Sequence, residues 1–230
     1  EGGVAVRLKK ITIANYRQFS NAVINFDDEL TILAGANNSG KTSIIELFRR
    51  LFRDRNFTKE DISAEYYSKL QRDFISDIDK IYSISLDETE FRENIKKKFS
   101  LDDKNKWTAI KIEIEVQYNK DESISLFSDY LMELGDACTS FFFQFNYEVD
   151  MAELNKLLGL NVTSLFEKKN EINTFSVARK TKEINEKIAE LNERFEDFLI
   201  EILETVLENK VYFTDKNYEN RQLIGVREFQ

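Results

Sequence analysis

Histidine and proline are absent from this chain of 230 residues, and cysteine occurs once, at Cys138. Without histidine there is no imidazole base, no histidine-ligated zinc and no Ser-His-Asp triad, so mechanisms of those kinds are excluded. A single cysteine excludes an internal disulfide bond. The sequence also shows no secretory leader and no run of 18 apolar residues, and these absences together predict a cytoplasmic protein without membrane association.

Glycine is also scarce, with 7 residues in the chain, yet two of them belong to one motif. Residues 35–42 read Gly-Ala-Asn-Asn-Ser-Gly-Lys-Thr, the pattern G-x-x-x-x-G-K-[ST] of loops that bind nucleoside triphosphates. The apolar run 30–34 predicts a buried parallel strand before the motif, and the apolar spacing over 43–52 predicts a helix after it. Strand, glycine loop and helix in this order form the context that the motif requires.

The physical chemistry of this motif assigns a role to each position. Gly35 and Gly40 allow backbone angles and a close approach that side chains would block, so backbone N–H groups point at phosphate oxygens. Lys41 supplies a cation for the outer phosphates of ATP, and the Thr42 hydroxyl is a ligand for Mg²⁺. The alternative interpretation is a glycine turn that begins an ordinary helix. The predicted nucleotide-binding residues of the loop are Gly35, Ala36, Asn37, Asn38, Ser39, Gly40, Lys41, Thr42 and Ser43.

Alternating apolar residues predict two further strand pairs. The first is a hairpin of residues 8–15 and 22–26, and the second joins 110–116 to 141–149, each strand with one buried and one solvent-exposed face. Such alternation is typical of antiparallel sheets, whereas the run 30–34 is typical of a parallel one. The sequence therefore predicts an α/β fold, a P-loop NTPase lobe with mixed parallel and antiparallel strands, followed by a mainly helical segment.

Helical spacing accounts for most of the remaining chain. Thr58 is a candidate cap for a helix from residue 59 to about 80, Gly135 ends a predicted helix at 123–134, and residues 151–210 are almost wholly helical. We expect three segments: a P-loop ATPase lobe at 1–150, a helical arm or dimerisation element at 151–210, and a return strand at 211–230.

A heptad-like seam runs along the last predicted helix. Apolar residues recur there at spacings of four and three, which is typical of a short coiled coil but equally of a helix that packs on its own domain. Both interpretations stay open, because the seam lasts less than three heptads. The seam residues are Ile184, Ile188, Leu191, Phe195, Phe198 and Ile202.

Charge is distributed unevenly. The net charge of the chain is −9, but residues 1–55 contain nine basic and six acidic residues. An acidic chain argues against a general nucleic-acid coat, although a local cluster of Arg49, Arg50, Arg53 and Arg55 could contact a phosphate backbone. The alternative is that these arginines form the solvated end of the helix that follows the loop, where cations suit the helix dipole.

Three stretches of the first 55 residues resemble a known family. They are residues 9–19 (Lys-Lys-Ile-Thr-Ile-Ala-Asn-Tyr-Arg-Gln-Phe), residues 24–26 (Ile-Asn-Phe) and the loop with its flanks at 30–43. Together they are similar to the amino-terminal lobe of an ABC-type ATPase, an AAA family ATPase of the RecF, SMC and overcoming-lysogenization-defect (OLD) groups. In these groups the loop commonly reads G-x-N-N-[SA]-G-K-[ST].

The resemblance implies an ATP-binding head that dimerises around its nucleotide and acts in DNA repair, DNA maintenance or anti-phage defence. It implies a homodimer or larger oligomer, contact with DNA through the complete assembly, and a nuclease or effector partner. By the same analogy Arg17 lies near the nucleotide, and Gln144, or with less support Gln117, joins Thr42 at the magnesium ion. The alternative for Gln144 is an ordinary solvent-facing position on a strand.

The chain departs from the family pattern in two respects. A complete head needs a Ser-Gly-rich signature loop and a strand that ends in Asp-Glu, and none of the glycines of this chain has a Ser-Gly-Gly context. The chain therefore resembles half of a head, which would hydrolyse ATP only when a second lobe and a dimer partner complete it. The catalytic residues are unknown from the sequence. The alternative class is a nucleotide-dependent interaction module with little hydrolysis.

One stretch imitates the missing acidic strand. Residues 81–88 end in Asp87-Glu88, which in an AAA-like ATPase would bind magnesium through water and polarise the attacking water. The competing interpretation is a helix cap, with Asp87 preceding Glu90 by three residues. We favour the cap, because serines at 83 and 85 suit a strand buried on both faces poorly.

Overall fold

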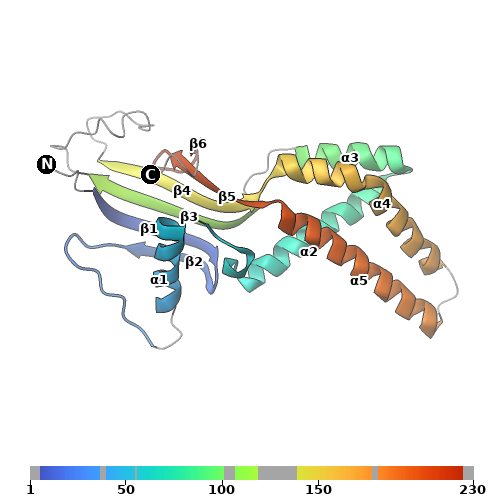
Figure 1. The fold of residues 1–230 in the computed structure, drawn as a ribbon, viewed down its shortest axis with the longest axis horizontal. Coiled ribbons are helices and arrows are strands. Elements are labelled where there is room, and N and C mark those ends of the chain that lie inside the picture. The colour runs from blue at the N-terminus through green and yellow to red at the C-terminus, as the bar shows by residue number, and fades with distance from the viewer. Residues whose placement is uncertain are drawn as a thin grey trace. The chain divides into compact units, whose positions relative to one another are not determined.

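The computed structural model describes residues 6–36, 40–54, 56–100, 107–118, 139–177 and 181–224. The chain divides into two compact units (Figure 1). The sheet unit contains residues 1–66, 108–148 and 209–230, and the helical unit contains 67–107 and 149–208. Residues 67–107, which precede the predicted boundary at 150, thus belong with the helices that follow it. The predicted helix at 123–134 lies outside the described residues.

The sheet unit is built on six strands in the order β2-β1-β3-β4-β5-β6. Both predicted strand pairs are confirmed as antiparallel pairs, β1 with β2 and β3 with β4, and the α/β fold class is confirmed with them. Strand β5 begins four residues before the predicted return strand, so the helical segment ends earlier than expected. The bounds are β1 Val6–Tyr16, β2 Phe19–Asn25, β3 Thr108–Tyr118, β4 Ser140–Val149, β5 Leu207–Thr214 and β6 Arg221–Ile224.

One face of this sheet is apolar and carries the first helix. Ile11 pairs with both Ile24 and Ile114, and the next row brings Ile112 opposite Phe145, so these side chains share a face. Helix α1 (Lys41–Arg49) lies across this face, as Figure 1 shows. The ring contact of its Phe48 with Phe26, 6.1 Å between centroids, fixes the side of the sheet that it covers. A π-helical turn, η1 (Arg50–Asp54), extends the helix.

The opposite face of β4 differs from the prediction of a solvent-exposed face. Gln144 and Asn146 are 2% and 1% exposed, and Glu148 is 5% exposed. The Glu148 carboxylate accepts hydrogen bonds from the Asn146 amide at 2.7 Å and from the Tyr212 hydroxyl at 2.6 Å. Alternation along one strand shows which residues share a face, but it does not show whether a neighbouring strand such as β5 brings polar partners to that face.

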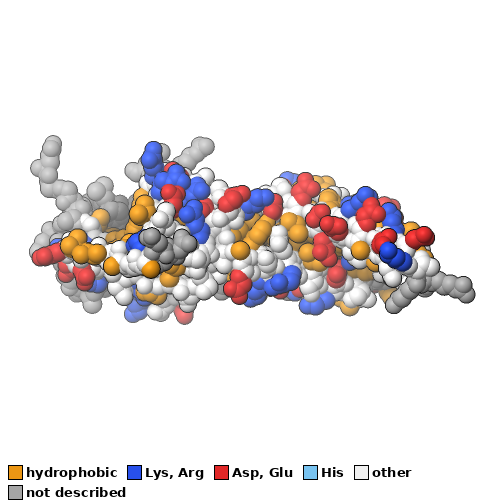
Figure 2. Space-filling view, turned by 90° about the horizontal axis from the view of Figure 1, so that it is seen from below, with side chains coloured by type: hydrophobic (Ala, Val, Ile, Leu, Met, Phe, Trp, Pro, Cys, Tyr) orange, Lys and Arg blue, Asp and Glu red, His pale blue; other side chains and the backbone are white. Residues whose placement is uncertain are grey.

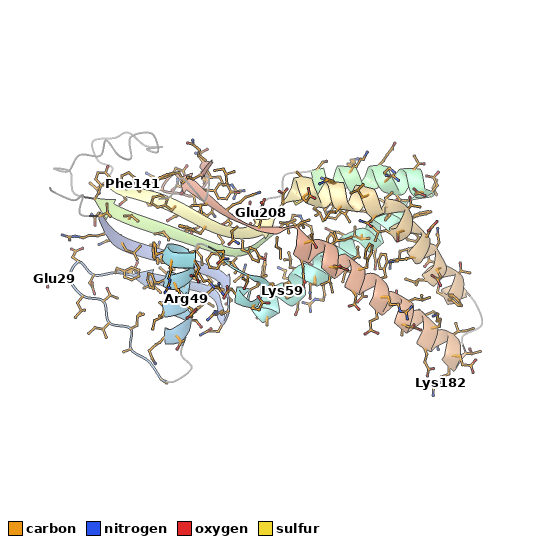
Figure 3. All side chains as sticks on the ribbon, in the orientation of Figure 1. Glu29, Arg49, Lys59, Phe141, Lys182 and Glu208 are labelled. Atoms are coloured by element: carbon orange, nitrogen blue, oxygen red, sulfur yellow. The ribbon has the colours of Figure 1, made fainter. Side chains whose placement is uncertain are left out.

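The predicted parallel strand at 30–34 is wrong. The chain leaves β2 and runs without a strand to the glycine loop, and the segment that begins near Glu29 carries its side chains outward (Figure 3). Leu30, Ile32 and Leu33 are 69%, 75% and 43% exposed. The physical reason is the lack of a neighbour, because a parallel strand needs another strand beside it and every described strand pairs within the antiparallel sheet.

Four helices form the second unit: α2 (Ala64–Ile84), α3 (Glu88–Ser100), α4 (Met151–Val177) and α5 (Lys182–Thr205). Thr58 caps a short 3₁₀ helix, η2 (Lys59–Asp61), instead of the start of α2. The rings of Phe74, Phe99 and Trp107 contact one another at 5.7–5.9 Å in the core of this unit. Among the described residues, no helix has the length and apolarity that crossing a bilayer requires.

The seam of α5 faces its own unit. Helix α5 packs against α4. Phe195 and Ile202 of the seam are 1% and 5% exposed, and the other four seam residues are half-buried. The ammonium groups of Lys168 and Lys169 on α4 lie over the rings of Phe198 and Phe195, at 4.0 and 4.4 Å from the ring centroids. These contacts favour the interpretation of a core-facing helix over that of an intermolecular coiled coil.

We predict that Phe195→Ala lowers the free energy of unfolding by about 3–5 kcal/mol, because it removes a buried ring and leaves a cavity. The loss should not depend on protein concentration, since the contacts are within one chain. Leu160→Ala is the control, because Leu160 on α4 is 73% exposed and its truncation should change stability little. Urea unfolding at two protein concentrations measures both effects, and a loss seen only at high concentration would support the intermolecular alternative.

Candidate functional site

The start of α1 has the properties of an anion site. Gly40 is its N-cap residue, with a left-handed φ of 95°, and no side chain caps the first turn. The first turn also contains no acidic residue, so nothing in it competes for the positive end of the helix dipole. Thr42 is exposed at this end, and Ser43 is buried beside it. Asn37, Asn38 and Ser39 of the predicted loop lie outside the described residues.

The ammonium group of Lys41 bridges the start and the end of the loop. It donates hydrogen bonds to the carbonyl oxygens of Gly35 at 2.5 Å and Ala36 at 2.7 Å. The lysine therefore points back over the loop, toward the backbone that the motif predicts to surround the phosphates. Gly35 and Ala36 are thus joined to the start of α1, where Gly40, Lys41, Thr42 and Ser43 follow one another.

The tip of the β1–β2 hairpin lies against this loop, a contact that the motif analysis did not identify. The Ser43 hydroxyl donates a hydrogen bond to Oε1 of Gln18 at 2.9 Å. A methyl group at Gly40 would lie 2.5 Å from Cζ of Phe19 and 2.7 Å from Nε2 of Gln18. The second glycine of the motif is therefore required both by its backbone angle and by the hairpin. The signal was present in the sequence, since Gln18 and Phe19 end the first stretch that resembles the family.

Arg17 is held by a carboxylate. Its guanidinium donates to Oδ1 of Asp61 at 3.1 and 2.9 Å, and Nε of Arg50 lies 3.0 Å from the other carboxylate oxygen. Asp61 is 1% exposed, so the two arginines compensate a buried charge. This places Arg17 at the hairpin tip beside the loop, with its charge directed at Asp61. Burial raises the pKa of the neighbouring Tyr16 to about 12, so that phenol stays neutral at physiological pH.

Two arginines of the cluster after the loop, Arg49 and Arg50, are paired with acids. Arg49 contacts Glu46 at 2.8 Å and Asp54 at 3.1 Å, while Arg50 contacts Asp54 and Asp61. Figure 2 shows basic and acidic side chains interleaved on the visible face. These pairs favour the solvated helix end over a nucleic-acid patch, while Arg55 lies outside the described residues.

Gln144 is not brought to the loop. It lies opposite Glu113 on β3, and it alternates along β4 with Phe143 and Phe145, whose side chains belong to the face that α1 covers. Thr42 and Gln144 therefore lie on opposite sides of the sheet, and Gln144 is buried instead of facing solvent. Gln117, the alternative, pairs with Ser140 at the far end of the same strands.

Asp87 is a helix cap. Its Oδ1 accepts a hydrogen bond from the backbone N–H of Glu90 at 2.9 Å, and the Glu90 carboxylate accepts one from the backbone N–H of Leu86 at 2.7 Å. Glu88 is engaged by Arg92 and by the Thr163 hydroxyl. Residues 81–84 belong to α2, so there is no strand that ends in Asp-Glu here, and the AAA-like use of Asp87 and Glu88 is not supported.

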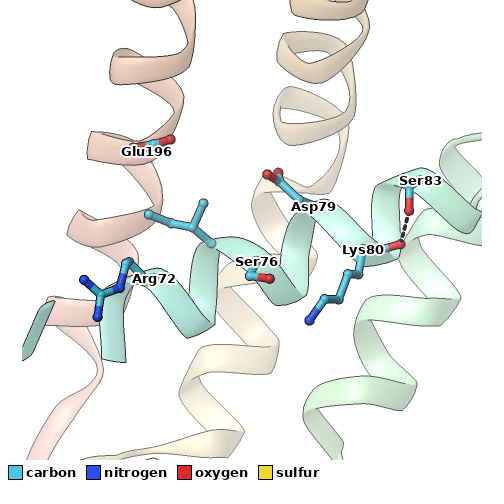
Figure 4. A pocket seen from close by; sticks show the side chains of 7 residues that line it. Arg72, Ser76, Asp79, Lys80, Ser83 and Glu196 are labelled. Carbon is cyan, nitrogen blue, oxygen red and sulfur yellow. Dashed lines mark hydrogen bonds between the residues drawn. The ribbon is translucent and has the colours of Figure 1, made fainter. Parts of the chain in front are cut away.

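A shallow pocket in the helical unit is a less suitable site (Figure 4). Arg72 and Lys80 are balanced there by Asp79 and Glu196, Asp79 is itself paired with Lys169, and the Ser83 hydroxyl donates to the Lys80 carbonyl oxygen. The described part of the chain also contains no cluster of three His, Cys, Asp or Glu residues suited to a metal ion. The loop at α1 remains the best candidate. The pocket is lined by Arg72, Ile75, Ser76, Asp79, Lys80, Ser83 and Glu196.

We predict that Asp87→Ala lowers the free energy of unfolding by about 1 kcal/mol, because it removes the α3 cap. Asp87→Ser should keep most of this stability, because serine is also a good cap residue. Neither substitution should change the affinity for MgATP. Thermal unfolding and calorimetric titration measure the two quantities. If Asp87→Ser abolished MgATP binding, the acidic-strand interpretation would have to be restored.

We predict that Gly40→Ala lowers the free energy of unfolding by about 2–4 kcal/mol, through left-handed backbone strain and contact with the hairpin. Gly159→Ala is a matched control, because Gly159 lies within α4 with nothing within 4 Å of an added methyl group. The control should stabilise the protein by about 0.5–1 kcal/mol, since alanine is the better helix former. Urea unfolding distinguishes the two, and equal effects would contradict the tight contact at Gly40.

Comparison with known proteins assigns the chain to a family. The family described as an AAA ATPase domain matches residues 7–230. An uncharacterized protein of Methanocaldococcus jannaschii is 29% identical over 91 residues, 39% of this chain and 28% of its own length. The DNA replication and repair protein RecF of Macrococcus caseolyticus is 42% identical over 41 residues, 18% of this chain and 11% of its own length. No solved structure is significantly similar. The family match covers nearly the whole chain, including the glycine loop at α1. The chain therefore belongs to the AAA ATPase domain family.

Proposed function

We propose that this chain is the ATP-binding portion of an ABC-type ATPase that acts on DNA, in repair, maintenance or anti-phage defence. The observation that carries the proposal is the uncapped start of α1 behind Gly40, with the Lys41 ammonium directed at the loop backbone. This arrangement has the donors that a triphosphate needs: backbone N–H groups, a helix dipole and a mobile cation. The similarity to RecF over 41 residues supports work on DNA.

Each residue of the loop would then have a specific task. Backbone N–H groups between Ala36 and Thr42 hold the phosphates, and Lys41 leaves the carbonyl oxygens of Gly35 and Ala36 to bind the outer phosphate. The exposed Thr42 hydroxyl fits a magnesium ligand, because it lies at the helix start without a capping role. The bound ion would neutralise charge that develops during phosphoryl transfer. In such reactions the protein acts by positioning and electrostatics instead of covalent chemistry.

We further propose that hydrolysis requires a second lobe. Helix α1 buries Ile44 and Leu47 against the sheet, yet Ile45 of α1 and Phe52 of the following turn η1 are 65% and 52% exposed. Leu30, Ile32 and Leu33 are a second set of exposed apolar side chains. A helix that is apolar on two sides is typical of an interior position, so this surface is suited to a covering layer that carries the missing catalytic groups.

The chain spans only part of the relatives it matches, 28% of the Methanocaldococcus jannaschii protein and 11% of the RecF protein. The activity and partners of the whole assembly are therefore parts of the proposal. A homodimer or larger oligomer, DNA bound by the complete assembly, and an associated nuclease or effector are parts of the same proposal.

A second candidate function is a nucleotide-dependent interaction module. The observation that favours it is that the acidic residues near the loop are already engaged: Asp61 and Asp54 by arginines, and Glu46 by Arg49. Without an available carboxylate to orient water, the described residues bind nucleotide more readily than they hydrolyse it.

We predict that Lys41→Ala weakens MgATP binding by about 100-fold or more, because it removes the charge-assisted hydrogen bonds to the outer phosphate. Lys182→Ala is the matched control, since the Lys182 side chain on α5 is 91% exposed and belongs to the helical unit. Calorimetric titration with MgATP measures the affinities. If Lys41→Ala bound MgATP as tightly as the unchanged protein, the assignment of the loop would be wrong.

ATP turnover by the 230 residues alone and by the native gene product that contains them separates the two functions. Turnover that appears only in the native gene product supports the ATPase proposal. Binding without turnover in both forms supports the interaction module.

A further inference from the structure

The hairpin tip forms a second wall of the loop site. A methyl group added at Gly40 would lie 2.7 Å from Nε2 of Gln18 and 2.5 Å from Cζ of Phe19, which is too close for either contact. Gln18 lies in the turn between β1 and β2, and Phe19 is the first residue of β2, so neither belongs to the P-loop motif. The chain thus places a polar side chain from outside the motif beside the backbone that would hold the phosphates.

This tip is held firmly. Asn15 and Arg17 have φ angles of 61° and 49°, a left-handed conformation that costs free energy for residues other than glycine. The backbone N–H of Arg17 donates to the carbonyl oxygen of Asp61, and that of Ser63 donates to Asn15, both at 2.8 Å. The buried Asp61 carboxylate also holds the Arg17 guanidinium. A side chain on this tip is therefore preorganised before any ligand arrives.

The Gln18 amide has a defined orientation. Its Oε1 accepts the hydrogen bond from the Ser43 hydroxyl, so its NH₂ group is on the side of Gly40. Gln18 is exposed at this position, and a primary amide offers two N–H donors. Ser43 lies in the first turn of α1, where backbone N–H groups also point outward. The amide therefore adds a donor to the donors of the helix start.

We propose that Gln18 Nε2 donates a hydrogen bond to the phosphate of the bound nucleotide that is nearest the sugar. This inference rests on the proposed function, because it assumes that the loop binds ATP. The position follows from the order of the loop: Lys41 reaches the outer phosphates and Thr42 the magnesium ion, so Ser43 and its partner Gln18 face the inner end of the triphosphate chain. Gln18 is thus a nucleotide ligand supplied by the hairpin.

Four variants test this role. Gln18→Met keeps the length of the side chain but removes its donors, and Gln18→Glu replaces the NH₂ group by a carboxylate oxygen that repels phosphate. Ser43→Ala removes the hydrogen bond that orients the amide while leaving Gln18 in place. Asn21→Asp on β2 is the charge control, because it adds the same charge to the same hairpin at an exposed position.

Calorimetric titrations with MgATP and with ADP provide the measurement. We expect Gln18→Glu to weaken both nucleotides by a similar factor of about tenfold or more, since both contain the inner phosphate, and Gln18→Met by about threefold to tenfold. Asn21→Asp should change either affinity by less than about threefold. Ser43→Ala should weaken both nucleotides, but by no more than Gln18→Met does, because it releases the amide without removing its donors. Thermal unfolding confirms that each variant is folded, and if Gln18→Glu fails to fold, Gln18→Met decides the question.

Three results would overturn the inference. Unchanged affinity in Gln18→Met shows that the donor is not used, and an equal loss in Asn21→Asp and Gln18→Glu shows that only the added charge on the hairpin matters. A loss for ATP alone shows that the contact is with the outer phosphate instead. If the unchanged protein binds neither nucleotide, the proposed function fails and this role of Gln18 fails with it. If the unchanged protein binds nucleotide and Gln18→Met binds it equally well, only the role of Gln18 is rejected.

Discussion

The close contact between Gly40 and the hairpin tip is the constraint on which the site depends. A left-handed glycine ends the loop, and Phe19 and Gln18 fill the space that any larger residue would need. The same tip is fixed by Asp61, whose buried carboxylate also binds Arg50 just beyond α1. The loop, the hairpin and helix α1 therefore pack as one unit. A shift of any one of them would also move the backbone N–H groups of the other two.

Local patterns predicted the elements of the sheet unit well, because alternation and glycine spacing depend on near neighbours in the sequence. The β1–β2 hairpin, the β3–β4 pair and the helix after the loop are all present. The pattern at 30–34 was misleading, since an apolar run indicates burial but not which partner supplies it. Likewise, the burial of Gln144 depends on the order of strands in the sheet, which no single segment encodes.

The candidate site, too, could be predicted from the sequence only where local patterns determine it. The motif identified Lys41 and its loop from spacing alone, because each position has a fixed task toward phosphate. The contacts of Gln18 and Asp61 could not be read from motif spacing, because they join residues 25 and 44 positions apart, although Gln18 lies in a stretch that resembles the family. The cap at Asp87, by contrast, was readable from Glu90 three residues later, since the capping box is a local device.

The polar face of β4 has a consequence for how the sheet can tolerate change. The buried Glu148 carboxylate accepts hydrogen bonds from both Asn146 and Tyr212, so replacing Glu148 by a hydrocarbon side chain would remove the acceptor that these two donors share. This trio spans two strands, and α4 and α5 lie between those strands in the sequence. These polar contacts therefore join the two strands that flank the helical segment in the sequence. Substitutions within α4 and α5 are tolerated only as long as the helices keep β4 and β5 in the same relative position.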